Sequence, residues 1–459
     1  MRVMVRDGWP FTSPVIFVDG LQSSHQTLDG YVCLWHDGDS SGDWLTTDGF
    51  FARIDQWCDQ AKTGWDRRGL ARDAYLNFAK KHPAVVIYDL DALHVSGEGA
   101  WGDFHARAPT PWRVELGPGT ARAPHLSGVW FHVGHVDVPP RSLEELRTAL
   151  PRTQRRGLNR ALADRRDVGP LERSGGVDLV MFRWDTDAGR HLLVIALSGS
   201  GDDVDGHVLI DGPIDEASLL LRSGPDANLL RQRSAVIFGV GAIGGHAAVC
   251  IAASGIGRLR VVDGDQILPG NVVRHVIGHQ GVGVPKVHAV EVEIKDHAPW
   301  TEVDTVLDRP VSPSRLNELV DDVDLVIDAT GTEAISGSLA IIAARAGKPL
   351  ISGALFRGGA IGRVRRQGTS GDVHFADRVP PAYRMIPPGA ADDELVEPAV
   401  GCSAPANNAP PASVLACAAL IAQASVDVLS GHCHLPDEIT VVYRPLEGET
   451  PFDELGRVL

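Results

Sequence analysis

A glycine-rich turn in the second half of the chain has the residue types and spacing of a nucleotide-binding turn. An apolar run, Ala235–Phe238, leads into it, and an apolar helical pattern follows it. The glycines stand in G-x-G-x-x-G spacing, at Gly239, Gly241 and Gly244. Glycine lets the backbone turn tightly and approach a phosphate, and a helix N-terminus offers unpaired N–H donors with a partial positive charge. Taken alone, the pattern favours an NAD or FAD enzyme.

Polar residues downstream of this turn favour ATP instead. Asp263 and Asp265 end the next apolar run, where Asp263 could accept hydrogen bonds from both ribose hydroxyls. Four residues of complementary chemistry follow, at Asn271, Arg274, Lys286 and Asp328. Lys and Arg offset the charge of a triphosphate and an Asp can hold Mg²⁺, which suits cleavage between the α- and β-phosphates. An NAD site has no need of this combination.

The order of these elements resembles the ThiF/MoeB/ubiquitin-activating-enzyme superfamily over the segment from Asn228 to Gly431. The resemblance implies an α/β fold, ATP and Mg²⁺ as cofactors, and adenylation of the C-terminal carboxylate of a protein or peptide. It implies that Asp263 binds the ribose and that Asp328 is the Mg²⁺ ligand. It also implies phosphate contacts from Asn271, Arg274 and Lys286, with Arg274 and Lys286 acting in catalysis.

Two positions depart from the pattern of that superfamily. Its members usually have Gln after the arginine, where this chain has His275. The arginine that one subunit gives to its partner's site has no clear match, and the candidates are Arg222, Arg231 and Arg233. The resemblance also implies a homodimer in which each subunit completes the site of the other.

Cys402 is the first candidate nucleophile. It lies in the Pro-, Gly- and Ala-rich segment Val364–Pro410, which is interpreted as a long crossing loop. In members of the superfamily that pass on an acyl group as a thioester, the thiolate comes from this loop and attacks the acyl-adenylate, with AMP leaving. The alternative is that Cys402 is the remnant of a lost zinc-binding C-x-x-C. Cys250 and Cys417 fall on apolar helical patterns and are interpreted as packing residues.

Cys33 is the second candidate nucleophile. A Trp9-Pro10 corner precedes a strand at Val15–Val18, and a group of single residues follows in order: His25, Gly30, Cys33, Leu34 and Trp44. This order resembles the core of ubiquitin-conjugating enzymes, which implies that Cys33 takes the acyl group and presents it to a lysine. The family's His-Pro-Asn is His25-Gln26-Thr27 here, so the Asn that stabilises the oxyanion is missing. The alternative is a buried Cys in an unrelated strand.

The nucleotide-site residues need a scaffold of alternating strands and helices, and the chain has one from Ala227 onward. Apolar runs predict strands at Ala235–Phe238, Leu259–Val262, Val303–Leu307, Leu325–Asp328, Pro349–Gly353 and Ile439–Tyr443. Helices are predicted at Ile243–Ala253, Ile335–Ala346 and Ala412–Leu429. This alternation predicts a Rossmann-like, doubly wound and mostly parallel sheet of the α/β class.

Three domains are predicted. Residues 1–82 form an α+β conjugating-enzyme-like domain, with strands at Arg2–Val5 and Val15–Val18 and a helical stretch from Asp48 to Lys81. Residues 83–225 form an α+β linker domain without recognisable chemistry. Its predicted strands are Ala84–Tyr88, Val129–Val133, Leu179–Phe182 and Leu192–Leu197, and its predicted helix is Ser142–Ala163. Residues 226–459 form the activating domain.

The conjugating-like domain is predicted to be incomplete at its N-terminus. Conjugating enzymes begin with a helix and two strands before the Pro-marked corner, whereas here only Met1–Gly8 precede Trp9. Such a short sheet exposes an edge and buries little apolar area. Either the true start lies upstream, or strands of the linker domain such as Ala84–Tyr88 cover the gap.

Composition narrows the partners. The 459 residues carry a formal net charge of -16 and no Lys/Arg block, so nucleic acid is not expected as a partner. We expect no apolar run to cross a membrane, and no apolar signal core begins the chain, so a cytoplasmic protein is predicted. The six cysteines form no C-x-x-C pair, which argues against a structural zinc site.

The sequence therefore predicts an activating–conjugating fusion like those in bacterial antiphage defence. It would adenylate the C-terminus of a ubiquitin-like protein or a protein tail, form a thioester on Cys402, transfer it to Cys33 and make an amide with a lysine of a target. Three alternatives stay open. They are a sulfur-carrier adenylyltransferase in which Cys33 has no role, a nucleotide-gated scaffold without covalent chemistry, and an NAD-dependent oxidoreductase.

Overall fold

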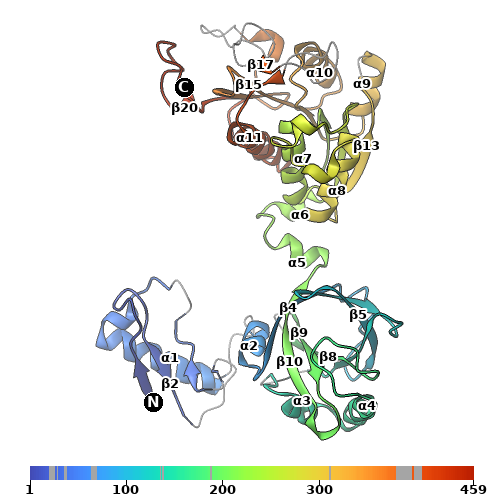
Figure 1. Cartoon of the computed structure of the whole chain (residues 1–459). Helices are drawn as coiled ribbons and strands as arrows, with labels where there is room; N and C mark the ends of the chain where they lie inside the picture. The colour runs from blue at the N-terminus through green and yellow to red at the C-terminus, as the bar shows by residue number, and fades with distance from the viewer. Residues whose placement is uncertain are drawn as a thin grey trace. The chain divides into compact units, whose positions relative to one another are not determined.

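A computed structural model describes residues 1–19, 26–27, 29–35, 39–63, 70–134, 136, 139–186, 189–309, 312–378, 395–396 and 406–458. The chain divides into two compact units, Met1–Ser218 and Leu219–Leu459 (Figure 1). The predicted domain limits at 82/83 and 225/226 stay predictions, although the first falls inside a strand, Lys81–Tyr88.

The N-terminal part of the first unit is a small antiparallel sheet with one long helix. Its elements are β1 (Arg2–Met4), β2 (Val15–Phe17), β3 (Tyr31–Val32), the 3₁₀ turn η1 (Asp43–Leu45) and α1 (Thr47–Thr63). Apolar side chains from these elements form its core, at Ile16, Val32, Leu34, Trp35, Trp44 and Trp57. The predicted continuous helix from Asp48 to Lys81 is wrong at its end, because α2 (Leu70–Asn77) stops before Lys81 begins a strand.

The rest of the first unit contains strands and helices, as predicted for an α+β domain, and its strands close into a seven-stranded barrel. Its strands are β4 (Lys81–Tyr88), β5 (Trp101–Thr110), β6 (Arg113–Pro118), β7 (Leu126–His132), β8 (Leu179–Thr186), β9 (Gly189–Ser198) and β10 (Asp205–Pro213). Around the barrel they run in the order β10-β4-β6-β5-β7-β8-β9. The predicted helix Ser142–Ala163 is two helices, α3 (Leu143–Ala149) and α4 (Arg152–Ala163). Pro151 separates them because proline has no N–H to donate within a helix.

The barrel decides one alternative left open above. Ala84–Tyr88 lies in β4, which pairs in parallel with β10 and with β6. The hypothesis that these residues cover the gap in the N-terminal sheet is therefore wrong, because both edges of β4 are already paired inside the barrel.

The second unit is built on an eight-stranded sheet of order β13-β12-β11-β14-β15-β16-β19-β20. Its strands are β11 (Ser234–Phe238), β12 (Arg258–Val262), β13 (Glu302–Val306), β14 (Leu325–Asp328), β15 (Leu350–Phe356), β16 (Ile361–Gln367), β19 (Glu438–Val442) and β20 (Gly456–Val458). The first five in this order are parallel, and the last three are antiparallel additions. The predicted doubly wound, mostly parallel sheet is confirmed, and the parallel strands follow the order of dinucleotide-binding folds.

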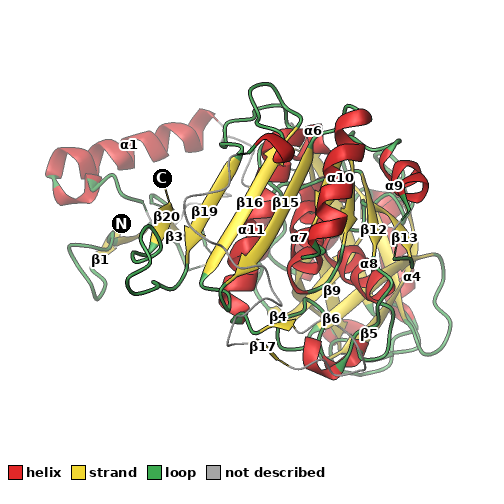
Figure 2. Cartoon of the chain, turned by 90° about the horizontal axis from the view of Figure 1, so that it is seen from above, coloured by secondary structure: helices red, strands yellow, loops and turns green. Residues whose placement is uncertain are grey.

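Helices cover both faces of this sheet. The α-helices of this unit are α6 (Ala227–Leu230), α7 (Ala242–Ala253), α8 (Lys286–His297), α9 (Pro313–Val320), α10 (Glu333–Arg345) and α11 (Pro411–Leu429), while α5 (Glu216–Leu220) spans the limit between the two units. Short 3₁₀ turns lie at Gly201–Asp203, Pro269–Asn271, His279–Gly281 and Phe375–Asp377, and a small strand pair joins Leu395–Val396 to Ala406–Asn407. The helices α7, α8 and α11 pack on one face, and α9 and α10 pack on the other (Figure 2).

Two sequence interpretations of this unit need correction. The segment Val364–Pro410 was taken wholly as a crossing loop, but it begins within β16, whose residues pair with β15 and β19. The second correction concerns the expectation that no apolar run is long enough to cross a membrane, because α11 passes that test by length and composition. Half of it is buried inside the unit, where it packs on α7 and β15, so it serves as a core helix of the fold.

Candidate functional site

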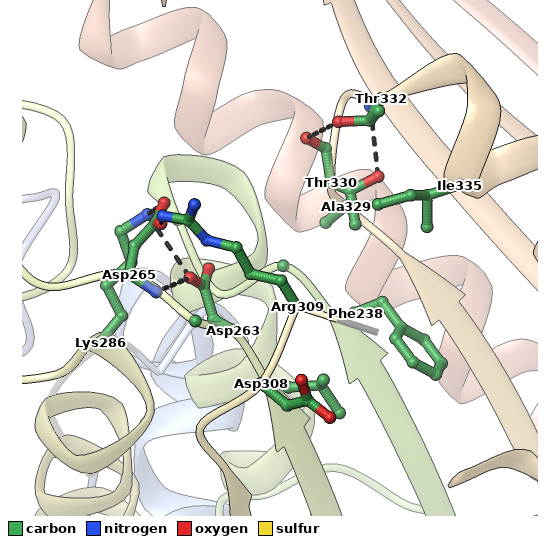
Figure 3. A pocket seen from close by; sticks show the side chains of 14 residues that line it. Phe238, Asp263, Asp265, Lys286, Asp308, Arg309, Ala329, Thr330, Thr332 and Ile335 are labelled. Atoms are coloured by element: carbon green, nitrogen blue, oxygen red, sulfur yellow. Dashed lines mark hydrogen bonds and ion pairs between the residues drawn. The ribbon is translucent and has the colours of Figure 1, made fainter. Parts of the chain in front are cut away.

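A cavity of about 310 Å³ opens at the carboxyl ends of the parallel strands. Its lining comes from the glycine-rich turn and from the segments that follow β12, β13 and β14, at Phe238, Gly239, Gly241, Val262, Asp263, Gly264, Asp265, Lys286, Asp308, Arg309, Ala329, Thr330, Thr332 and Ile335. Figure 3 shows the charged side chains of Asp263, Asp265, Lys286 and Arg309 close together, with the two threonines on another wall. A cavity of this size at this edge of a parallel sheet suits a nucleotide.

The glycine-rich turn needs its glycines for different reasons. Gly239 has φ +82°, and a Cβ there would lie 2.9 Å from the backbone of Thr330. A Cβ on Gly244 would lie 1.9 Å from the carbonyl oxygen of Gly239, so this glycine lets α7 pack against the turn. A Cβ on Gly241 would meet nothing within 4 Å, and Gly241 lines the cavity. The turn therefore brings the backbone and the N-terminus of α7 to the cavity wall, where a phosphate could bind.

Asp263 binds the backbone of the glycine-rich turn, and Asp265 binds the side chains of Lys286 and Arg309. The Oδ2 of Asp263 accepts a hydrogen bond from the backbone N–H of Val240 at 3.0 Å, and its Oδ1 accepts one from the N–H of Asp265 at 2.9 Å. The Nζ of Lys286 donates to Oδ2 of Asp265 at 2.8 Å and lies 3.7 Å from Oδ1 of Asp263. Arg309 donates to the other oxygen of Asp265. Asp265 thus holds both cations at the wall of the cavity.

Burial and the cations act differently on the two carboxyl groups. Burial raises the pKa of Asp263 above its usual range, and the charge of Lys286 offsets this only in part. Burial acts in the same direction on Asp265, but the hydrogen bonds and charges of Lys286 and Arg309 bring the pKa of Asp265 below its usual range. Asp265 therefore stays ionised and keeps its partners at neutral pH, because a carboxylate beside cations favours its charged form.

His275 supports the glycine-rich turn from behind. Its Nε2 donates to the carbonyl oxygen of Val240 at 2.9 Å, and its Nδ1 accepts from the N–H of Ile277 at 3.1 Å. Because Nδ1 accepts, the ring is neutral and carries its proton on Nε2. Burial lowers the pKa of His275 to about 4, and the positive charge of Lys286 lowers it further than burial alone would. His275, which stands where the superfamily usually has Gln, thus helps to fix the shape of the glycine-rich turn.

The lowered pKa of His275 predicts that the second unit is less stable to unfolding at acidic pH. The pKa of His275 is about 4 in the folded state and 6.5 ordinarily, so the folded state favours the neutral ring. The contribution of this ring to the free energy of unfolding is fully present above pH 6.5 and is lost as the pH falls toward 4. We expect a loss of about 2 kcal/mol in unfolding free energy between pH 7 and pH 5 from this group. His275→Gln keeps a donor and an acceptor without a titrating ring, so this part of the pH dependence should disappear in urea unfolding. The exposed His297, changed to Gln, is the control, and equal pH dependence in all three proteins would contradict the assignment.

Asp328 lies under the cavity rather than in its lining. It is 1% exposed, and its Oδ1 accepts from the N–H and the hydroxyl of Thr330, at 3.1 and 2.8 Å. Its Oδ2 accepts from the hydroxyls of Ser336 and Ser352. These four bonds use every acceptor site of the carboxylate, so Mg²⁺ does not fit there unless one hydroxyl turns away. The Mg²⁺ ligand role of Asp328 stays a prediction.

The structure does not bring Asn271 and Arg274 to the cavity lining. The side-chain oxygen of Asn271 accepts from the N–H of Leu268 at 2.9 Å, which closes the local 3₁₀ turn. Arg274 is half-buried, and its carbonyl oxygen accepts from His246 at 3.2 Å. Their predicted phosphate contacts therefore stay predictions, whereas the glycines, Asp263 and Lys286 do meet at one place.

Four cavity residues were missed in the sequence: Asp308, Arg309, Thr330 and Thr332. Asp308 and Arg309 follow β13, and the threonines follow β14. Their positions in the sequence could have indicated them, because residues directly after parallel strands lie at one edge of the sheet, and ligands bind at that edge. Asp308 also accepts from Nε of Arg315 at 3.1 Å, which ties this loop to α9.

The predicted roles of the cysteines have different outcomes. Cys402 and His25 lie outside the described residues, so their predicted roles stay predictions. Cys417 is fully buried, and burial raises the pKa of its thiol to about 12, which makes it a packing residue. The packing interpretation of Cys250 is wrong, since this thiol is exposed on α7. The core residues of this part of α7 are Ala247, Ala248, Val249, Ile251 and Ala252.

Cys33 is exposed and borders a small hollow of about 130 Å³. The hollow is also lined by Leu34 and by residues of α1, at Arg53, Gln56, Trp57 and Gln60. The alternative of a buried Cys33 is therefore wrong. The fold also joins two elements of the conjugating-enzyme resemblance, because Nε1 of Trp44 donates to the carbonyl oxygen of Pro10 at 2.9 Å.

Comparison with known proteins assigns the second unit. Residues 219–450 match the ThiF family, which is just over half of the 459 residues. The chain belongs to the ThiF family. The match coincides with the compact unit Leu219–Leu459, which we call the ThiF domain, and the predicted superfamily is confirmed for this region. The match does not extend to residues 1–218, and the conjugating-enzyme resemblance there stays a prediction.

Curated relatives of the ThiF domain include proteins with named activities. The chain is 34% identical over 165 residues to an uncharacterized protein, y4oA, of Sinorhizobium fredii, covering 33% of this chain and 28% of that protein. It is 34% identical over 126 residues to the ATP-dependent ubiquitin transferase-like protein Cap2 of Pseudomonas aeruginosa, covering 27% and 22%. It is 27% identical over 182 residues to the adenylyltransferase and sulfurtransferase UBA4 of Lodderomyces elongisporus, covering 38% of each. The chain thus spans well under half of each relative's length.

Proposed function

We propose that the ThiF domain uses ATP to adenylate the C-terminal carboxylate of a protein or peptide. The observation that carries this proposal is the meeting of the glycine-rich turn, Asp263, Lys286 and Arg309 in one cavity. The names of Cap2 and UBA4, an ATP-dependent transferase-like protein and an adenylyltransferase, support it. A carboxylate oxygen of the substrate attacks the α-phosphorus of ATP, the bond to the bridging oxygen breaks, and pyrophosphate leaves.

Each wall of the cavity has a role in this reaction. The apolar side chains of Phe238, Val262 and Ile335 give the adenine ring a dry surface. Asp263 keeps acceptor capacity beyond its two backbone hydrogen bonds, which suits the ribose hydroxyls. The glycine-rich turn and the N-terminus of α7 offer N–H donors to the phosphates.

Lys286 and Arg309 supply the positive charge for the pyrophosphate leaving group. Both are bound to Asp265, so a triphosphate in the cavity competes with this carboxylate for them. Cations already fixed at the cavity wall need little rearrangement as charge moves onto the leaving oxygen, and such preorganised charge lowers the barrier. Mg²⁺ bound to the ATP would supply further charge stabilisation.

The later steps of the proposal involve the two candidate thiols. The thiolate of Cys402 attacks the acyl carbon of the adenylate and AMP leaves. The thiolate of Cys33 then attacks the new thioester and releases Cys402, and a lysine amine of the target releases Cys33 as it forms the amide. The exposure of Cys33 supports the second of these steps. Catalysis by Arg274, the homodimer, cytoplasmic location and a role in antiphage defence belong to the same proposal.

The test of adenylation is ATP–pyrophosphate exchange by the full chain. Exchange that depends on added peptides with a free C-terminus, and that disappears when this terminus is an amide, is the expected result. ATP binding without any exchange would instead favour the nucleotide-gated scaffold. Hydride transfer to NAD in the absence of ATP would favour an oxidoreductase.

The thiols can be separated by two variants. We expect Cys402→Ala to keep the exchange reaction and lose every thioester that dithiothreitol releases, because the adenylate forms without this thiol. Cys33→Ala should leave the acyl group on Cys402 and abolish amide formation on lysine. Gel analysis of a labelled substrate, with and without dithiothreitol, measures both, and the exposed Cys250 changed to Ala is the matched control. Unchanged lysine conjugation in Cys33→Ala would show that Cys33 does not carry the acyl group. Adenylate formation without any lysine amide in the unchanged protein would favour the sulfur-carrier type of adenylyltransferase.

A further inference from the structure

A row of polar side chains runs outward from the nucleotide cavity across one face of the sheet. Asp328 of β14 pairs with Ser352 of β15, Ser352 with Arg365 of β16, and Arg365 with Glu438 of β19. Residues paired across neighbouring strands project from the same face of a sheet. Thr330, which lines the cavity, donates to Asp328, and Ser352 donates to the same carboxylate at 2.9 Å. The row is therefore joined to the cavity at one end.

Arg365 is the basic residue of this row, and it binds no carboxylate in the part of the chain that the structure describes. It is half-buried, and its guanidinium lies 4.6 Å from the centre of the Phe375 ring. The acidic residues of the row bind other groups: Glu438 accepts from Arg378 at 2.6 Å, and Asp328 accepts from four donors. Burial, with the charges of Arg363 and Arg378, lowers the pKa of Arg365 to about 10.

The neighbouring arginines show what is missing at Arg365. Arg366 projects from the opposite face and binds Asp372 through two nitrogens. Arg378 binds both Asp437 and Glu438. Arg363 lies two residues from Arg365 on the same face, over the ring of Phe356 at 4.9 Å. Holding a guanidinium half-buried without a carboxylate costs free energy, so an added anion at this place would be favourable.

The position of Arg365 argues against the phosphates of ATP as this anion. No residue of β15 or β16 lines the cavity, and the glycine-rich turn lies on the other side of β14. Neighbouring strands are about 4.8 Å apart, which puts Arg365 about 10 Å along the sheet from Asp328. An extended peptide covers that distance in about three residues. The other substrate, whose carboxylate must reach the α-phosphate, would pass this point.

We propose that Arg365 selects substrates with an acidic side chain two to four residues before the C-terminal carboxylate. The proposal rests on the adenylation function proposed above and adds the substrate class. The carboxylate of an Asp or Glu accepts the fork of N–H donors of Arg365, with Arg363 adding positive charge on the same face. Phe375 holds the guanidinium plane in place, which is the arrangement that arginine offers and lysine does not.

The test uses the full chain, ATP and synthetic hexapeptides with a free C-terminus. Each peptide carries Glu, or Gln in its place, at one of the positions two, three or four residues before the end. Hydroxylamine traps the adenylate as a hydroxamate with release of AMP, and mass spectrometry counts each product. We expect the wild type to prefer Glu over Gln about tenfold at one position, since a charge-assisted hydrogen bond is lost with Gln.

Arg365→Gln should lower this preference to about one, and Arg365→Lys should restore it only in part. Arg457→Gln is the matched control, because Arg457 pairs with Val441 in the register of the opposite face and is exposed. Its Glu preference should equal that of the wild type. If Arg365→Gln does not fold, Arg365→Lys carries the test, and a Glu preference equal to that of the wild type in this variant would contradict the assignment.

Three results would overturn the proposal. Equal use of Glu and Gln peptides by the wild type would show that no acidic side chain is read. A Glu preference that persists in Arg365→Gln would place its recognition elsewhere, and an equal rise in the KM for ATP with every peptide would assign Arg365 to the nucleotide. Absence of hydroxamate from every peptide, in the wild type and the variants alike, would instead overturn the adenylation function itself.

Discussion

Lys286→Met should lower the rate constant of ATP–pyrophosphate exchange by about two to three orders of magnitude, the usual cost of removing one preorganised charge from an active site. Lys286 is 13% exposed in its side chain and holds its Nζ 2.8 Å from Asp265 and 3.7 Å from Asp263. Methionine keeps the length of the side chain and removes the charge. The carboxylates of Asp263 and Asp265 then face the phosphates without this counter-charge, so the effect should appear in the rate as well as in the KM for ATP.

The matched control for this variant is on the same helix. Lys295 of α8 donates to the carbonyl oxygen of Thr301 and lies outside the cavity lining. Lys295→Met should therefore change stability slightly and leave exchange within about twofold of the wild type. Exchange by Lys286→Met within a factor of three of the wild type, in a protein of unchanged thermal midpoint, would remove Lys286 from the site.

Asp178→Ala should destabilise the barrel by about 3–5 kcal/mol, the cost of leaving a buried charge without its partner. Asp178 is 1% exposed and accepts from the N–H and hydroxyl of Ser174, at 2.8 and 2.6 Å. It also accepts from the N–H of Ser127 at 3.0 Å and lies 3.7 Å from Arg165, whose side chain is fully buried. Alanine would leave the guanidinium of Arg165 without its counter-ion, and two N–H groups and one hydroxyl without an acceptor.

Urea unfolding followed by tryptophan fluorescence measures this loss. Of the ten tryptophans, only Trp300 lies in the second unit, so the signal reports the first. The control is the exposed ion pair of Asp205 with Lys80, where Asp205→Asn should cost under about 1 kcal/mol. If Asp178→Ala cost no more than this control, the buried network would not be a source of barrel stability.

The glycine-rich turn shows why part of the site could be predicted from the sequence. The strand β11, the three glycines and α7 are contiguous, so their order alone indicates a turn that can approach a phosphate. The β/α alternation in the same region indicated the parallel sheet, because right-handed crossovers leave few other topologies for such a pattern. The strand Leu325–Asp328 was placed with its observed ends.

The barrel shows the opposite case. The barrel closes because β10 pairs with β4, although more than a hundred residues separate the two strands. Neither segment contains a sequence pattern that indicates its partner strand. The strands β5 and β6 were missed because most of their residues are exposed or half-buried, which removes the apolar alternation that marks a strand. Without these two strands and β10, an α+β domain could be predicted but its closure into a barrel could not.

By itself, the sequence determined the family of the second half, the nucleotide turn and the aspartate and lysine that meet there, because these are properties of contiguous segments and of strand ends. Only the tertiary structure decided which distant side chains share the site. It brought Arg309 to Asp265, placed His275 behind the turn and gave Asp328 four hydrogen bonds. Among the residues that the structure describes, it gave Arg365 no bound carboxylate. The physical reason is that charge pairing and burial depend on neighbours across strands, and those neighbours are distant in the chain.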